Sequence, residues 1–257
     1  MVNTVCVLTN FRAGSTAFTL LKSKEYDLPY MGELFSHERP WEYGGHLAFW
    51  QELEMGRDDP DNPLIPTFVQ GRPFREDYIK ALKNGEQTCF KLMPDHVIEP
   101  WRRKPWPHGE VDLEIVKSVD KVILLYRRDW KAQVLSWVAL RTNGEFGRNG
   151  LRHSRKSGNP RLVDFHWNMH VAEDYYDEAV VRTLDVEPES QYVENLAGQL
   201  KLNYLRMAEL HKQLDNVEVV CMEDFFATQP YKKYNHVFDW KKGEPVVEDF
   251  DVEGLFT

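Results

Sequence analysis

Four short, mostly apolar runs that are rich in β-branched residues recur along the chain and predict buried strands. They lie at residues 4–9, 88–93, 121–126 and 217–221. Runs in which apolar side chains follow one another with little alternation are typical of strands that helices cover on both faces. The pattern therefore predicts the core of a parallel sheet.

Segments in which apolar residues recur with helical spacing lie between and after these runs. We expect helices at residues 17–24, 74–83, 113–118, 130–140, 167–183 and 192–214. Strands that alternate with helices indicate an α/β fold with a central parallel sheet flanked by helices. A chain of 257 residues fits one large domain, so we expect a single domain over residues 1–257.

The net charge changes what this fold is expected to bind. Asp and Glu number 41 against 32 Lys and Arg, which gives a formal charge of −9. General nucleic-acid binders neutralise phosphates with cationic surfaces, so we expect no nucleic-acid partner. We also expect no membrane span, because no apolar stretch approaches the ~20 residues that a bilayer requires. A cytoplasmic location is expected, and any bound anion needs a local cationic site.

The three cysteines support the same picture. Cys6, Cys89 and Cys221 are widely spaced, and each falls in a predicted strand. Free cysteine behaves as a small apolar residue in protein cores. We therefore expect three buried, reduced thiols.

The turn between the first predicted strand and helix has the features of an anion-binding loop. It contains Arg12, Ala13, Gly14, Ser15 and Thr16. A glycine lets the backbone approach a ligand, and the helix N-terminus that follows presents unpaired N–H groups and partial positive charge. The loop is not a Walker A motif, which needs two glycines five apart and a following lysine. An ordinary helix N-cap is the alternative interpretation.

A second group of charged residues follows the predicted strand at 121–126. Arg127 and Arg128 end the strand, Asp129 is placed to begin the next helix, and Ser136 lies eight residues after Arg128. Positions eight apart are separated by roughly 40–80° around a helix. Both side chains reach one anion only if Arg128 lies on the preceding turn and curls back. An Arg–Asp ion pair at a helix start, with a core-facing serine, is the alternative interpretation.

These two motifs together resemble those of sulfotransferases that use 3′-phosphoadenosine 5′-phosphosulfate (PAPS). In that family a loop similar to residues 12–16 binds the 5′-phosphosulfate, and a pair similar to Arg128 and Ser136 grips the 3′-phosphate. The string at residues 124–136 is most similar to the bacterial carbohydrate sulfotransferases of the trehalose type. The resemblance implies a P-loop nucleotide-hydrolase-like three-layer sandwich, with PAPS as co-substrate and no metal.

Three weaker similarities extend the resemblance. The segment at residues 30–35 is similar to one that supplies a glutamate, here Glu33, to the active site of that branch. The strand with Lys91 is similar to one that carries an inward lysine in the family. The run at residues 219–225 is similar to a late strand that leads into an acidic helix start, whose role is mostly structural. The resemblance covers about residues 2–35, 88–96, 120–142 and 215–228.

The resemblance also implies roles in catalysis. Glu33 would be the general base, since its apolar neighbours would raise its proton affinity by desolvation; a strand-end glutamate paired with an arginine is the alternative. Eukaryotic cytosolic sulfotransferases use a histidine where this chain has Met93, and His96 is kept as the alternative base. Arg12 and Lys91 would stabilise the charge that develops on the leaving nucleotide.

The acceptor is expected to be the hydroxyl of a carbohydrate or another small molecule. Unmatched segments contain Trp41, Trp50, Trp101 and Trp106, whose rings suit sugars. A basic loop at residues 141–161 would close over PAPS or recruit an anionic acceptor, or would be a solvated surface loop. Two other functions stay open: a P-loop-type nucleotide kinase or phosphotransferase, and a non-catalytic nucleotide-binding module. The oligomeric state is also open, with a homodimer among the options.

Overall fold

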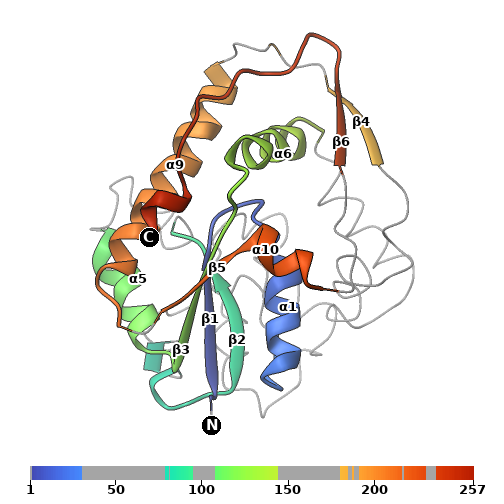
Figure 1. Ribbon diagram of the computed structural model, residues 1–257. Coiled ribbons are helices and arrows are strands. Elements are labelled where there is room, and N and C mark those ends of the chain that lie inside the picture. The colour runs from blue at the N-terminus through green and yellow to red at the C-terminus, as the bar shows by residue number, and fades with distance from the viewer. Residues whose placement is uncertain are drawn as a thin grey trace, which may run out of the picture.

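The computed structural model describes a parallel sheet, the helices around it and the C-terminal segment (Figure 1). The residues it describes are 2–30, 79–80, 82–94, 108–143, 180–184, 187, 191–215, 217–229 and 236–257.

The sheet consists of the four strands that the apolar runs predict. They are β1 (Thr4–Thr9), β2 (Thr88–Leu92), β3 (Lys121–Tyr126) and β5 (Glu218–Cys221). All of the pairings are parallel, in the order β2-β1-β3-β5 (Figure 1). β1 is central and entirely buried, as expected for a run without polar alternation. The predicted α/β class with a parallel sheet and flanking helices is confirmed.

Helices pack on both faces of the sheet because successive side chains of a strand point to opposite sides. Val5 and Val7 of β1 belong to a cluster with residues of α1 (Ser15–Glu25) and α10 (Met222–Ala227). Cys6 and Leu8 belong to a second cluster that includes residues of three further helices. These are α5 (His108–Lys117), α6 (Trp130–Asn143) and α9 (Gln191–His211). Four predicted helices thus correspond to α1, α5, α6 and α9.

Two further predictions concern short stretches of this core. Residues 79, 80, 82 and 83 are helical, in agreement with the helix expected at 74–83; the rest of that range is not described. Cys6, Cys89 and Cys221 are buried free thiols, as expected.

A second sheet corrects one prediction. β4 (Val180–Leu184) pairs in parallel with β6 (His236–Trp240), so the helix expected at 167–183 is wrong at its end. Residues 167–179 lie outside the described part of the chain. The stretch Val-Val-Arg-Thr-Leu is rich in β-branched residues, and such residues favour a strand wherever a partner strand is present. That partner comes from a distant part of the sequence, which helical periodicity does not reveal.

The C-terminal segment, residues 241–257, runs from β6 back along α9 and ends in a short 3₁₀ helix, η2 (Glu253–Leu255) (Figure 1). Val252 is buried, the ring of Phe250 lies 5.2 Å from that of Trp130, and the ring of Phe256 lies 5.5 Å from that of Tyr126. Through these contacts the segment packs beside the end of β3. No helix in the described ranges is long and apolar enough to cross a membrane.

The strand order determines where a ligand is expected. From β1 the chain continues to β2 on one side, and then crosses to β3 on the other side of β1. In open α/β sheets, ligands bind beyond the carboxyl ends of the strands at such a switch point. Thr9 is in register with Leu125, so the loops that follow β1 and β3 leave the sheet side by side.

Candidate functional site

The loop between β1 and α1 has a left-handed backbone at two positions. Arg12 has φ 60° and Gly14 has φ 69°. Gly14 is the residue before α1, and no side chain caps the helix there. A Cβ at Gly14 would lie 3.2 Å from Cγ of Met222 and 3.4 Å from the ring of Phe226, so only glycine fits without a shift. The loop therefore leads directly into first-turn N–H groups that no side chain caps, and such groups suit an anion.

Lys91 places an ammonium group beside the start of α1. Its side chain is on β2, where the residue is only 3% exposed. Nζ donates a hydrogen bond to Oγ1 of Thr16 at 2.8 Å. The structure thus brings together Lys91 and the loop, two features that lie 75 residues apart in sequence.

Two hydrogen bonds connect the β1–α1 loop with the residues that follow β3. Nε of Arg12 donates to Oγ of Ser136 on α6 at 3.0 Å. Nη1 of Arg127 donates to the carbonyl oxygen of Arg12 at 3.2 Å. The two sequence motifs therefore form one site, in which Ser136 is bonded to Arg12 rather than to Arg128.

The Arg127 guanidinium is the more buried of the two that follow β3. Its side chain is 14% exposed, and burial lowers the pKa of Arg127. Nε has no hydrogen-bond partner among the described residues, and Oε1 of Glu223 lies 3.7 Å away. Arg127 is therefore an inward cation that supports the backbone of Arg12.

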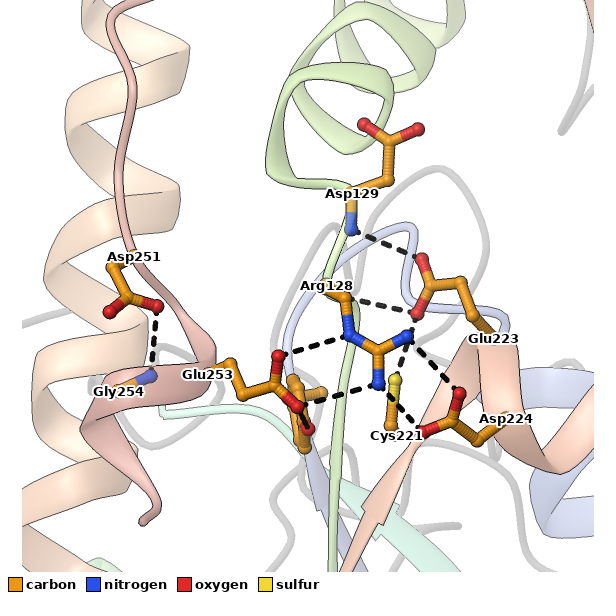
Figure 2. A network of polar contacts seen from close by, with 9 residues as sticks. Arg128, Asp129, Cys221, Glu223, Asp224, Asp251, Glu253 and Gly254 are labelled. Carbon is orange, nitrogen blue, oxygen red and sulfur yellow. Dashed lines mark hydrogen bonds and ion pairs between the residues drawn. The ribbon is translucent and has the colours of Figure 1, made fainter.

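Arg128 points in another direction, toward two carboxylates (Figure 2). Nη1 and Nη2 donate to Asp224 at 3.1 and 2.7 Å, and Nε and Nη2 donate to Glu253 at 3.1 and 3.4 Å. These ion pairs raise the pKa of Arg128, and the Arg128 guanidinium lowers the pKa of Asp224. Two edges of the guanidinium thus bind acids of the chain itself.

The start of α6 is held by backbone hydrogen bonds. Oε2 and Oε1 of Glu223 accept from the N–H groups of Arg128 and Asp129 at 3.0 and 3.2 Å (Figure 2). Asp129 in turn accepts from the N–H of Ala132 at 2.9 Å, as an N-cap residue does. Burial alone would raise the pKa of Glu223, but the hydrogen bonds from backbone amides and from the Cys221 thiol together outweigh it, and the net shift is downward.

A buried chain of polar side chains lies beneath both loops. The hydroxyl of Tyr204 accepts from the backbone N–H of Arg127 at 3.1 Å and donates to Oε1 of Gln133 at 2.7 Å. Nε2 of Gln133 donates to the carbonyl oxygen of Phe11. Burial raises the pKa of Tyr204, so its hydroxyl keeps the proton that this arrangement needs. One side chain of α9 thus connects the end of β3 with the loop after β1.

A second buried contact fixes the beginning of the same loop. Nδ2 of Asn10 donates to the carbonyl oxygen of Leu200 at 2.8 Å, and Oδ1 of Asn10 accepts from the N–H of Phe11 at 2.9 Å. Nδ2 of Asn203 also donates to Oδ1 of Asn10, at 3.3 Å. Asn10 is fully buried, so α9 holds the loop at two points.

The structure locates most but not all of the predicted site residues. Those it places are Arg12, Ala13, Gly14, Ser15, Thr16, Lys91, Arg128 and Ser136. Glu33, His96 and the four tryptophans of the unmatched segments lie outside the described residues. Of the basic loop at 141–161, only residues 141–143 are described, as the end of α6.

Several site residues were not singled out from the sequence. Gln133 falls in the motif after β3, but nothing local shows that it bonds to the other loop. Tyr204 appears as one more apolar position of a long helix, and Glu253 lies 125 residues after its partner Arg128. A buried tyrosine on the face of α9 that packs on the sheet is the nearest signal, because buried hydroxyls need partners.

Comparisons of the chain with protein-family models, with curated proteins and with solved structures found no match. The resemblance to sulfotransferases therefore rests on the motifs alone.

The Tyr204 hydroxyl gives a test of the buried network. Tyr204→Phe leaves Oε1 of Gln133 and the N–H of Arg127 buried without this partner, so we expect a loss of about 1–3 kcal/mol in the free energy of unfolding. Urea titration measures it. Tyr192→Phe is the control, because Tyr192 is 41% exposed. Equal effects of the two changes would contradict the role assigned to the hydroxyl.

Glu223 gives a pH-dependent test. Its folded pKa is below the ordinary value of 4.5, so its contribution to stability is present above pH 4.5 and is lost as the pH falls through the folded pKa. We expect Glu223→Gln to cost about 1 kcal/mol at pH 7. The difference from wild type should shrink below pH 4.5, as followed by unfolding at a series of pH values.

Glu209→Gln serves as the matched control, since Glu209 pairs with Lys212 on the surface of α9 with its side chain 66% exposed. A Glu223→Gln effect that stays constant across the acid range would show that the carboxylate charge is not what stabilises the start of α6.

Proposed function

We propose that this chain transfers the sulfuryl group of PAPS to a hydroxyl of a carbohydrate or other small molecule. One observation carries the proposal: Arg12 of the first motif and Ser136 of the second are joined by a 3.0 Å hydrogen bond at the carboxyl ends of adjacent parallel strands. Two motifs that resemble the 5′- and 3′-phosphate sites of one nucleotide thus form one site. The P-loop-like three-layer sandwich is part of the same proposal.

The residues after β1 suit the phosphosulfate end of PAPS. In the proposed reaction the acceptor oxygen attacks sulfur, and the bond from sulfur to the 5′-phosphate oxygen breaks, so negative charge grows on the nucleotide. Arg12 precedes α1 in the loop and Lys91 bonds to Thr16 in the first turn of α1, and preorganised cations stabilise such charge best. Gly14, Ser15 and Thr16 supply N–H and hydroxyl donors, so no metal is required.

The proton of the acceptor hydroxyl needs a base. Glu33 holds this role in the proposal, with His96 as the alternative. A positioned general base contributes about 10²–10⁴-fold to the rate. The remaining acceleration would come from alignment of the acceptor with sulfur and from the cations of the loop.

The 3′-phosphate is what distinguishes PAPS from ATP, and the proposal assigns it to Arg128 and Ser136. Ser136 is only 8% exposed but is directed at Arg12, so its hydroxyl connects the two ends of the site. Arg128 is 43% exposed along its side chain and therefore accessible, although two carboxylates now bind it.

A nucleotide kinase and a non-catalytic binding module are the competing proposals. The loop after β1 has its arginine before the glycine and no lysine directly after it, which disfavours a Walker A function. A module would bind the nucleotide without cleaving it. The tests below separate the three.

Binding of 3′-phosphoadenosine 5′-phosphate (PAP), the nucleotide product, is the first test. At 100 times its dissociation constant, PAP should add about 2.7 kcal/mol to the stability of the wild type, measured as a thermal shift. Arg128→Ala and Ser136→Ala should each lose most of that shift, because each removes a donor to the 3′-phosphate.

Lys131→Ala is the control for lost charge, because Lys131 is also on α6 and its side chain is 55% exposed. It should keep the full shift. No shift in the wild type, or full shifts in both site variants, would refute the assignment. A larger shift with ATP and Mg²⁺ than with PAP would favour the kinase.

Glu33 is tested by turnover. Glu33→Gln keeps the shape of the side chain but removes the base, so we expect sulfate transfer to fall at least about 100-fold while PAP affinity changes little. Labelled sulfate from PAPS, offered to a mixture of sugars and small alcohols, measures the transfer. Near-normal turnover would exclude Glu33 as the base, and His96→Gln would then be expected to abolish it. PAP binding without transfer to any acceptor would favour the binding module.

A further inference from the structure

Glu253, close to the C-terminal end of the described chain, binds the arginine that the proposed function assigns to the 3′-phosphate. Its Oε2 accepts from Nε of Arg128 at 3.1 Å, and its Oε1 accepts from Nη2 at 3.4 Å (Figure 2). This is a two-point contact of a carboxylate with one edge of a guanidinium. A phosphate would make the same kind of contact with the same edge.

The other edge of Arg128 is also bound. Asp224 accepts from Nη1 at 3.1 Å and from Nη2 at 2.7 Å. A guanidinium has five N–H donors and two edges that suit two-point contacts of this kind. A 3′-phosphate held by two hydrogen bonds from Arg128 therefore has to replace one of the two carboxylates.

Of the two acids, Glu253 is the one placed to leave. Asp224 is in α10, next to Glu223, and Glu223 is bonded to the backbone of Arg128 and Asp129. Asp224 is therefore fixed to the same support as the arginine. Glu253 is on a 3₁₀ helix of three residues in the segment that follows β6, and its two contacts with Arg128, at 3.1 and 3.4 Å, are the longer pair.

The Glu253 carboxylate also accepts a hydrogen bond from a group other than Arg128. The hydroxyl of Tyr126, the last residue of β3, donates to Oε1 of Glu253 at 3.1 Å. An oxyanion that replaces this carboxylate would receive hydrogen bonds from Arg128 and from Tyr126. The arrangement has the donors of an anion site, with a carboxylate of the chain as its present occupant.

We propose that Glu253 is an internal competitor of the nucleotide 3′-phosphate, and that nucleotide binding releases η2 from Arg128 and Tyr126. This inference rests on the proposed function and adds a regulatory contact to it. The C-terminal segment then reports on occupancy of the site. Any partner or modification that pulls the segment away raises nucleotide affinity, because the competing carboxylate is removed.

The experiment compares PAP affinity in the full chain with and without the competing charge. Glu253→Gln should bind PAP about two- to fivefold more tightly than wild type by titration calorimetry, the range set by a single exposed ion pair. A loss of packing does not produce a gain in affinity, so the sign of the effect separates competition from a structural role.

Two controls make the comparison specific. Glu244→Gln removes the same charge from a residue that is paired with Lys131 at 3.9 Å, so it should leave PAP affinity unchanged. Adenosine 5′-phosphate lacks the 3′-phosphate and should bind wild type and Glu253→Gln equally.

Hydrogen exchange tests the release of η2 directly. Exchange at the N–H groups of Leu255 and Phe256, which bond within the segment, should speed up when PAP saturates the wild type.

The outcomes separate this inference from the proposed function. PAP that binds wild type and Glu253→Gln equally, or the variant more weakly, would overturn the inference and leave the proposed function intact. Unchanged exchange at Leu255 and Phe256 in PAP-saturated wild type would overturn the release of η2. Failure of PAP to bind any form would refute the proposed function and this inference with it.

Discussion

The hydroxyl of Tyr204 determines how the two arginine-bearing loops lie relative to each other. It accepts from the backbone after β3 and donates to Gln133, which donates to the backbone after β1. The residue is fully buried, where hydrogen bonds are stronger than in water and a missing partner is costly. The contacts of Arg12 with Ser136 and of Arg127 with the Arg12 carbonyl join the same two loops.

Two of the arginines in the site lie next to carboxylates of the chain. The net charge of −9 indicates that any anion site must be built from local cations. Arg12 follows β1, Lys91 lies near the carboxyl end of β2, and Arg127 and Arg128 follow β3. Acids accompany the last two. Glu223 lies beside Arg127, while Asp224 and Glu253 bind Arg128. The more accessible arginine is therefore the one that two carboxylates neutralise.

Features of the fold and the site that depend on residues close together in sequence could be predicted, and features that depend on residues far apart in sequence could not. The strands of the main sheet and the helices α1, α5, α6 and α9 follow from local hydrophobic patterns, and they were predicted. β4 was not, because its strand conformation depends on pairing with residues 236–240. The same limit applied to the site. The motif after β3 suggested that Arg128 and Ser136 act together on one phosphate, and that pairing stays a prediction. The motif could not show that Ser136 bonds to a residue 124 positions away or that Arg128 meets the C-terminal segment.

Gly14 connects the anion-binding loop to a different part of the molecule. The space where its side chain would be is filled by Met222 and Phe226 of α10, the helix that also carries Glu223 and Asp224. The loop therefore packs directly against the helix that carries Glu223 and Asp224. Any side chain at position 14 would press on Met222 and strain the left-handed backbone at the same time, so a substitution there should disturb α10 and its carboxylates together with the loop.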